Sequence, residues 1–258
     1  MTDPPGPGRA DRVQFLGHAT LAVVLDGVTI LTDPVLRDRL AHLRRHRAVP
    51  RAVWPAAVDA VVISHIHQDH LDFRSLRLLG HQVHLIVPRG AGRLLWQHGF
   101  RNAQELAVGE TVQIGAVRVR ATPAVHSGFR PPFGPRAECL GFIFEGRERV
   151  YFAGDTDLYP EMGALGPIDV ALLPVWGWGP WLGPGHLDPA RAAEAVARIR
   201  PTVAIPIHWG TLYPFGLGPW SRGFLTRPPR AFAALAKAAA PGADVRIVAP
   251  GQSLGLLE

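Results

Sequence analysis

Short apolar runs, separated by glycine, proline and aspartate, recur along the whole chain and predict many short β-strands. The first three runs are residues 13–16, 21–25 and 28–31, and Asp26-Gly27 between the last two is a strong hairpin signal. Further strands are predicted at residues 60–64, 83–87, 111–114, 116–121, 140–145, 149–153, 170–173, 203–207 and 245–248. Strands are therefore expected in both halves of the chain.

Four stretches between these strands have the caps and the length of helices. They span residues 72–79, 90–98, 188–200 and 229–241. Asp72 and Asp188 are good N-caps, and Pro189 suits the first turn of a helix. Helices that follow strands in both halves predict an α/β fold, in which two packed sheets carry helices on their outer faces.

The length and the cysteine content limit how this fold can be stabilised. At 258 residues the chain can bury a sizeable core without disulfides. We expect a disordered tip over residues 1–11, which are rich in proline and glycine, and one domain over residues 12–258. The single cysteine, Cys139, excludes an internal disulfide and a cysteine-based zinc site, and is expected to be a small buried hydrophobe. Any metal ion must therefore be held by histidine and aspartate side chains.

The chain is moderately basic, with 27 lysine and arginine residues against 21 aspartate and glutamate residues. This excess suits anionic substrates, although a solvated basic face explains it equally well. The arginine-rich stretch 37–51 contains no aromatic residue, so no nucleic-acid partner is expected. No apolar run resembles a signal peptide or a membrane span, which predicts a cytoplasmic protein and leaves peripheral membrane contact and homo-oligomer formation open.

One stretch, Ser64-His-Ile-His-Gln-Asp-His70, concentrates the candidate chemistry directly after the apolar run 61–63. Imidazole nitrogens and a carboxylate fixed at the end of a strand are ligands that suit a divalent metal of the zinc type. A polar loop that happens to be rich in histidine is the alternative. Because His126, Asp155 and His208 also follow predicted strands, we interpret the stretch as half of a two-metal site.

The order His-x-His-x-Asp-His, a lone His, the Asp of Gly-Asp-Thr and a final His resembles the metallo-β-lactamase superfamily. The resemblance implies a four-layer αββα sandwich. The flanking sequence looks like the branch that contains N-acyl-phosphatidylethanolamine phospholipase D and, more distantly, like the ascorbate-6-phosphate lactonase group. The supporting segments are Phe15-Leu-Gly-His-Ala-Thr20, Leu31-Thr-Asp-Pro34, Phe152-Ala-Gly-Asp-Thr156, His186-Leu-Asp-Pro189 and Ile207-His-Trp-Gly-Thr211.

The resemblance also implies a role for each predicted metal ligand. One metal would be bound by His65, His67 and His126, the second by Asp69, His70 and His208, and Asp155 would bridge the two. A pair of divalent cations, most suitably Zn²⁺ and otherwise Mn²⁺ or Fe²⁺, shares a hydroxide at neutral pH, and this hydroxide is the expected nucleophile. Asp69 and Asp155 are therefore expected to be catalytic as well as metal-binding.

Three further residues are candidates for roles beside the metals. His186, in a Gly-Pro-Gly-His turn before a capped helix, is a candidate catalytic residue that holds an oxyanion or protonates a leaving group. The alternative is a surface histidine that caps this helix. Asp33 is expected to support a metal-bound imidazole, unless Thr-Asp-Pro is an ordinary turn, and His18 is a further candidate for that role.

Aromatic residues gather on two loops near the expected site. Trp176, Trp178 and Trp181 alternate with glycine and proline, and Tyr213 follows the last predicted ligand. We expect these side chains to contact substrate as an apolar wall. The alternative for the indoles is packing of their loop against the last helix.

Three functions fit these residues. The first is hydrolysis of a phosphodiester in an amphipathic, phospholipid-like substrate by the metal-bridging hydroxide. The second is a lactonase or ester hydrolase of a small metabolite, phosphorylated or not, and the third is a non-catalytic metal-binding partner protein. The complete ligand set favours an enzyme, a metal-dependent hydrolase of a small-molecule or lipid-like substrate.

Overall fold

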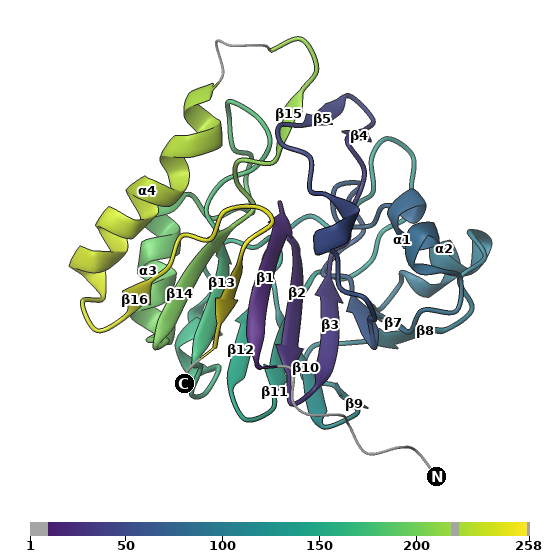
Figure 1. Ribbon diagram of the computed structural model, residues 1–258, viewed down its shortest axis with the longest axis horizontal. Coiled ribbons are helices and arrows are strands. Elements are labelled where there is room, and N and C mark those ends of the chain that lie inside the picture. The colour runs from purple at the N-terminus through teal and green to yellow at the C-terminus, as the bar shows by residue number, and fades with distance from the viewer. Residues whose placement is uncertain (1–9, 218–221, 257–258) are drawn as a thin grey trace.

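Two seven-stranded β-sheets pack face to face in the computed structural model, which describes residues 10–217 and 222–256 (Figure 1). The first sheet contains β1 (Arg12–Gly17), β2 (Thr20–Leu25), β3 (Val28–Thr32), β6 (Ala60–Val62), β7 (Leu85–Pro88), β8 (Ala103–Leu106) and β17 (Ser253–Gly255). Its strand order is β17-β1-β2-β3-β6-β7-β8. Pairing is antiparallel from β17 to β3 and parallel from β3 to β8.

The second sheet contains β9 (Thr111–Ile114), β10 (Val117–Pro123), β11 (Leu140–Glu145), β12 (Arg149–Phe152), β13 (Val170–Pro174), β14 (Val203–Ile207) and β16 (Asp244–Val245). Its order is β16-β14-β13-β12-β11-β10-β9. The pairs from β9 to β12 are antiparallel, and those from β12 to β16 are parallel. Both sheets are therefore mixed.

The central core lies between the two sheets and follows the two-residue period of the strands. In β11, Phe142 and Phe144 join this core, whereas Ile143 between them packs into the cluster on the outer face. Phe15 and Leu21 of the first sheet belong to the same central core. Successive side chains of a strand point to opposite faces, so each sheet has two apolar faces to cover.

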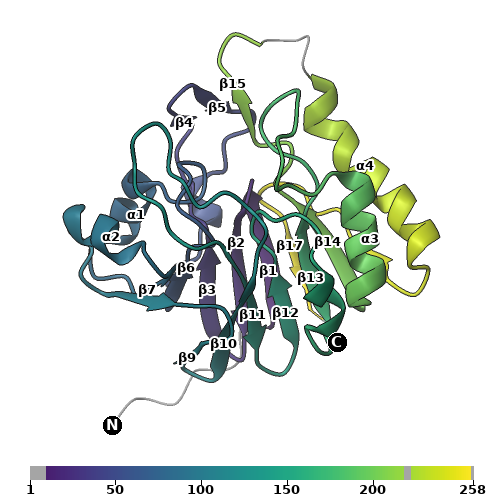
Figure 2. The ribbon, with the colours of Figure 1, turned by 180° about the vertical axis from the view of Figure 1, so that it is seen from behind.

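Helices cover both outer faces (Figures 1 and 2). The helices are α1 (Phe73–Leu79) and α2 (Gly92–Gln97) on the first sheet, α3 (Pro189–Ile199) and α4 (Arg222–Ala239) on the second, and the 3₁₀ turns η1 (Arg51–Val53) and η2 (Pro160–Ala164). Asp72 caps α1 by accepting a hydrogen bond from the Ser75 amide, and Asp188 caps α3 in the same way. The predicted four-layer αββα sandwich is confirmed.

A small third sheet was not predicted. It consists of β4 (Arg39–Leu40), β5 (Leu43–Arg45) and β15 (Leu212–Pro214), in the order β15-β5-β4, and lies at the top of Figure 1. Its first two strands fall in the basic stretch 37–51, which has no two-residue apolar period. The pairing of β15 with β5 connects segments that are far apart in the sequence.

Two predicted boundaries were wrong by three residues or more. The last helix begins at Arg222 and passes through Pro228 and Pro229, although each proline lacks the amide that a helix interior uses. The last strand of the second sheet is only Asp244–Val245, because pairing with β14 ends there.

The expected disordered tip falls mostly outside the described residues, which begin at residue 10. Asp11, the last residue of that tip, is held by the fold, because its carbonyl accepts a hydrogen bond from the Leu256 amide at 2.9 Å. Among the described helices, none is long and apolar enough to cross a membrane.

Candidate metal centre

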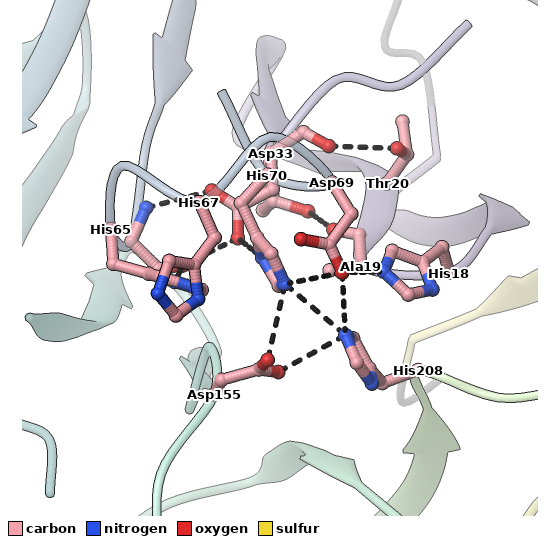
Figure 3. Close-up of polar contacts among 12 residues, drawn as sticks. His18, Ala19, Thr20, Asp33, His65, His67, Asp69, His70, Asp155 and His208 are labelled. Carbon is pink, nitrogen blue, oxygen red and sulfur yellow. Dashed lines mark hydrogen bonds and ion pairs between the residues drawn. The ribbon is translucent and has the colours of Figure 1, made fainter. Parts of the chain in front are cut away.

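The predicted metal ligands lie where strands end. The stretch from His65 to His70 follows β6, and His126, Asp155 and His208 follow β10, β12 and β14. These strand ends meet, so that side chains from both sheets converge on one small volume (Figure 3). The fold therefore brings together residues that are up to 143 positions apart, from 65 to 208.

Three residues around this volume have a backbone conformation that residues other than glycine rarely adopt. His18, Asp33 and His208 have φ angles of 58°, 34° and 62°, in the left-handed region. The His208 amide donates to the His18 carbonyl at 2.8 Å, and the His18 amide donates to Thr211 Oγ1 at 2.7 Å. Such conformations persist when neighbours fix them, and they are frequent at functional sites.

The first cluster consists of three imidazoles. His65, His67 and His126 offer ligand atoms within 4.8 Å of one another. Nε2 of His126 lies 3.1 Å from Nδ1 of His67. This is the triad that was predicted to hold one metal.

The second cluster lies beside the first and includes a carboxylate. Asp69, His70 and His208 come within the same 4.8 Å, and His18 joins them. Nε2 of His70 lies 3.1 Å from Nε2 of His208 and 3.8 Å from Asp69 Oδ2. His18 Nε2 lies 3.0 Å from that same carboxylate oxygen.

Asp155 stands between the groups, below His70 and beside His208 in Figure 3. Its two carboxylate oxygens lie 3.2 Å from His70 Nε2 and 3.2 Å from His208 Nε2. It also forms a ligand group with His126 and His186. This position suits the predicted bridging role.

Hydrogen bonds at the outer nitrogens show how the rings are oriented. Nδ1 of His126 donates to the Gly185 carbonyl at 2.7 Å, and Nδ1 of His208 donates to the Trp176 carbonyl at 2.7 Å. Nδ1 of His70 lies 2.7 Å from Asp33 Oδ2. With the proton on Nδ1, the neutral rings of His126 and His208 direct the lone pair of Nε2 toward the centre. The contact with Asp33 orients the His70 ring in the same way.

His65 is oriented by a chain of hydrogen bonds. Its Nδ1 lies 3.0 Å from Ser64 Oγ, and Ser64 Oγ donates to Asp33 Oδ2 at 2.5 Å. The hydroxyl therefore accepts from the ring, and Nε2 carries the lone pair. This Nε2 is buried and has no hydrogen-bond partner among the described residues.

Converging lone pairs of this kind fit a cation. Nε2 of His70 and Nε2 of His208 both face carboxylate oxygens, and a single proton can satisfy only one such pair. A divalent metal accepts all of these donors at once, and it would also give His65 Nε2 a partner. The donor set of nitrogen and carboxylate oxygen therefore fits the two predicted metal ions, and it suits zinc, manganese or iron.

The electrostatics set the protonation states of the clustered side chains. Burial lowers the pKa of His65 well below its usual value, that of His126 to about 4 and that of His208 to about 3. Burial would raise the pKa of Asp155, but His208 and His70 lower it well below its usual value. The rings of His65, His126 and His208 are therefore neutral, and Asp155 is charged, at pH 7. Burial would also lower the pKa of His70, but Asp155, Asp69 and Asp33 raise it well above its usual value, so a bound metal ion would have to displace the proton on its Nε2.

A comparison with known protein families identifies the fold. The model of the beta-lactamase superfamily domain matches residues 28–209, a span that contains every predicted metal ligand. The chain belongs to the metallo-β-lactamase superfamily. The resemblance drawn from its histidine and aspartate pattern is thereby confirmed.

Several relatives share this membership. The chain is 34% identical to an uncharacterized protein of Mycobacterium tuberculosis over 219 residues and 32% identical to N-acyl-phosphatidylethanolamine-hydrolyzing phospholipase D 1 of Caenorhabditis elegans over 229 residues. These matches cover 77% and 78% of the chain but only 58% and 64% of the two relatives. A UPF0173 metal-dependent hydrolase of Methanopyrus kandleri is 31% identical, with 81% of the chain and 88% of the relative covered.

Solved structures show the same metallo-β-lactamase fold. Igni18, a metallo hydrolase from Ignicoccus hospitalis, superimposes with a TM-score of 0.74 at 25% identity, over 95% of the chain and 98% of its own. CmlA, a diiron β-hydroxylase from Streptomyces venezuelae, has a TM-score of 0.71 at 22% identity, over 97% of the chain and 55% of its own. The likeness to CmlA concerns the fold alone.

The three residues that were predicted to act beside the metal ligands, Asp33, His18 and His186, lie close to the clusters. Asp33 is fully buried and accepts hydrogen bonds from the Ser64 amide at 2.7 Å and from Nδ1 of His70, a predicted ligand. His18 contacts Asp69, as described above. His186 is 21% exposed, and its Nε2 lies 3.5 Å from Asp155 Oδ2.

His186 also carries a shifted pKa. Burial alone would lower its pKa, but the hydrogen bond with Asp155 raises it to about 9. Its Nδ1 lies 3.0 Å from the Gly183 carbonyl and 3.1 Å from the Pro184 carbonyl, which fixes the ring. The ring lines a cavity rather than capping α3, since Asp188 is the cap.

A cavity of about 410 Å³ opens over the clusters, and we call it the metal-site cavity. Its lining residues are Leu40, Ala41, His42, Leu43, His67, Gln68, Asp69, Pro131, Pro132, Asp155, Trp178 and His186. Predicted metal ligands therefore form one side, and apolar side chains form much of the other.

Of the aromatic residues predicted to contact substrate, Trp178 lines this cavity. Trp181 does not, and its side chain is 86% exposed. Tyr213 pairs with Arg44 in the small sheet, and Trp176 supplies its carbonyl to His208 while its indole donates to Gly179. Trp176, Trp181 and Tyr213 are thus not among the residues that line the cavity.

Residues that the sequence did not single out also line the cavity. His42 packs edge-on against Trp178, with ring centroids 5.1 Å apart. Gln68 lies inside the metal-binding stretch and donates to the Pro131 carbonyl at 3.2 Å. Position within the histidine motif was a usable signal for Gln68, whereas no local pattern marked His42.

Gly154 shows how tightly the metal loops pack in this fold. Its φ is +61°, and a Cβ at this position would lie 2.5 Å from Ser64 Cβ and 3.0 Å from the Leu140 carbonyl. Gly154→Ala is therefore expected to lower the free energy of unfolding by about 2 kcal/mol or more. Urea denaturation measures this change, and Gly163→Ala, where a Cβ meets nothing closer than 3.6 Å, is the control. Equal stability of the two variants would show that the loops can move apart.

Proposed function

We propose that the chain is a binuclear metal-dependent hydrolase that cleaves a phosphodiester in an amphipathic substrate. The observation that carries the proposal is the metal-site cavity, in which His67, Asp69 and Asp155 face the apolar side chains of Leu43 and Trp178. A phosphoryl group at the clusters would place an attached apolar group against that wall. The relative from C. elegans is named as a phospholipase, which supports the same chemistry.

The two clusters described above would hold one divalent cation each, and Asp155 would contact both. Cations bound there would lower the pKa of water to provide hydroxide at neutral pH and would neutralise charge on the phosphoryl oxygens. The chain itself would set the orientations of the imidazole rings. The carbonyls of Gly185 and Trp176 and the carboxylate of Asp33 form hydrogen bonds with the Nδ1 atoms that face away from the metal site.

His186 is placed to act on the substrate itself. Its Nε2 faces the metal-site cavity beside Asp155, and its Nδ1 is fixed by backbone carbonyls. Water supplies the oxygen of the new P–O bond, the P–O bond to the alcohol breaks, and the alcohol leaves with a proton. A protonated His186 can donate that proton or hold a phosphoryl oxygen.

The function is tested by comparing two substrate classes with the metal-loaded protein. We expect hydrolysis of bis-p-nitrophenyl phosphate and little turnover of a panel of lactones. Turnover of lactones without the phosphodiester would overturn the proposal in favour of a lactonase. Full metal content without hydrolysis of either class would instead indicate a non-catalytic metal-binding protein.

The apolar wall gives a prediction about substrate binding. Trp178→Ala removes an indole from the metal-site cavity, so KM for a p-nitrophenyl phosphodiester with an alkyl chain is expected to rise about 10-fold, with kcat little changed. Trp181→Ala is the matched control, because that indole is exposed and lies outside the cavity. Steady-state kinetics on both variants measure this effect. An unchanged KM in Trp178→Ala would show that the indole does not contact the alkyl chain of the substrate.

A further inference from the structure

A second cavity, of about 610 Å³, adjoins the metal-site cavity. The two share the lining residues Leu40, Ala41 and Gln68, so they lie side by side at the hairpin of the small sheet and at the stretch that carries the predicted metal ligands. We call the second one the arginine cavity, because its charged lining consists of Arg37, Arg39, Arg74, Arg77, Arg130 and a single carboxylate, Asp72.

That carboxylate is already paired. Asp72 accepts two hydrogen bonds from the Arg37 guanidinium, from Nε at 2.7 Å and from NH2 at 2.9 Å. It also accepts from the amide and the hydroxyl of Ser75 at the start of α1. Arg37 is therefore held in place and neutralised, while four further guanidinium groups face the cavity without a carboxylate of their own.

Arg130 is fixed without being neutralised. Its NH1 donates to the carbonyl of Leu71 at 3.2 Å and to that of Ile66, and its guanidinium lies 5.2 Å from the centre of the Phe73 ring. These partners are uncharged. Arg130 thus links the wall of the arginine cavity to the loop that carries the predicted metal ligands.

The side chains of Arg39, Arg74 and Arg77 form no hydrogen bond or ion pair with any residue in the described part of the chain. Like charges that share a concave wall repel one another and raise the local positive potential. A phosphate group relieves that repulsion, because its oxygens accept the forked hydrogen bonds of several guanidinium groups at once. A solvated basic face would not need a wall of this shape beside the site.

We propose that the arginine cavity binds a second, non-reacting phosphate monoester group of the substrate whose scissile bond lies at the metal clusters. This inference rests on the proposed function for the location of the scissile bond. The substrate would then be an amphipathic molecule with one phosphoryl centre in the metal-site cavity and a terminal phosphate in the arginine cavity. The terminal phosphate can belong to a soluble metabolite or to a lipid headgroup.

The test uses the metal-loaded full chain and a double variant, Arg74→Gln with Arg77→Gln. Both side chains are exposed on α1 and have no described partners, so their replacement leaves the fold and the clusters intact. The control is Arg93→Gln with Arg230→Gln, which removes the same charge from exposed positions that line neither cavity.

The first measurement compares kcat/KM for methyl p-nitrophenyl phosphate with that for its phosphopropyl analogue, which adds a terminal phosphate. Wild type and control are expected to prefer the phosphorylated substrate by about 10-fold or more, and the Arg74/Arg77 variant is expected to lose this preference. Activity on the methyl ester stays equal in all three. A preference that survives in the Arg74/Arg77 variant, or that is absent from wild type, overturns the proposal.

The second measurement needs no catalysis and separates this proposal from the proposed function. Binding of glycerol 3-phosphate is measured by calorimetry, and co-sedimentation is measured with phosphatidylcholine vesicles that contain or lack phosphatidic acid. Selective loss of glycerol 3-phosphate binding in the Arg74/Arg77 variant supports a soluble source, and selective loss of phosphatidic-acid binding supports a headgroup. If the Arg74/Arg77 variant and the control bind both probes equally, the arginine cavity is not a phosphate site, whether or not the chain hydrolyses phosphodiesters.

Discussion

Asp155→Asn is expected to abolish phosphodiester hydrolysis and to lower the metal content of the purified protein. Asp155 places one carboxylate oxygen 3.2 Å from His70 Nε2 and the other 3.2 Å from His208 Nε2, so a neutral amide would remove the charge that both contacts use. The amide nitrogen would also present hydrogens to lone pairs of the imidazoles. We expect a loss of about 1,000-fold or more in kcat/KM, which corresponds to about 4 kcal/mol of transition-state stabilisation.

Metal analysis by mass spectrometry and hydrolysis of bis-p-nitrophenyl phosphate measure the two effects separately. Asp157→Asn is the matched control, because Asp157 lies on the same loop but pairs with Arg191 and caps the Leu158 amide. That variant should keep its metal and its activity. If Asp155→Asn retained both, Asp155 could not be the group shared by two metal ions.

The residues of the two clusters could be predicted because their signal is local. Three histidines and an aspartate occur within six positions, and the strand before them is a continuous apolar run. The same kind of signal, a polar residue within three positions of the end of a buried strand, indicated Asp155 and His208. The two-sheet arrangement was equally predictable, since helix caps and apolar runs alternate in both halves.

The walls of the site could not be predicted in the same way. His42 reaches the metal-site cavity because β5 pairs with β15, and no pattern within the stretch 37–51 indicates a partner near residue 212. The arginine cavity depends on the same hairpin folding toward α1, so the basic stretch was visible in the sequence while its concave shape was not. Tertiary pairing, rather than local pattern, determined both features.

The groups that orient the imidazole rings could not be predicted from the sequence for another reason. The carbonyls of Gly185 and Trp176 bind the outer nitrogens of His126 and His208, and a backbone carbonyl has no signature in the sequence. Trp176 was expected to contact substrate through its indole, whereas its carbonyl contacts a predicted ligand. Asp33 is the exception, because a side chain supplies the oxygen and could be proposed from its position after a strand.

Asp33→Ala is accordingly expected to be the most destabilising substitution near the site. The carboxylate is fully buried and accepts hydrogen bonds from the Ser64 amide at 2.7 Å, from Ser64 Oγ at 2.5 Å and from His70 Nδ1 at 2.7 Å. Alanine leaves these three buried donors without an acceptor. We expect a loss of about 3 to 5 kcal/mol in the free energy of unfolding, measured by urea denaturation of chelator-treated protein.

The same substitution should weaken metal binding about 10- to 100-fold, because His70 and, through Ser64, His65 lose the group that orients them. Asp33→Asn keeps one acceptor oxygen and should lie between wild type and alanine in both measurements. Asp59→Ala is the control, since that carboxylate accepts a single described hydrogen bond, from the Thr29 amide at 2.7 Å, and is remote from the clusters. A variant Asp33→Ala that lost stability but bound metal as tightly as Asp59→Ala would show that Asp33 holds the fold together without tuning the ligands.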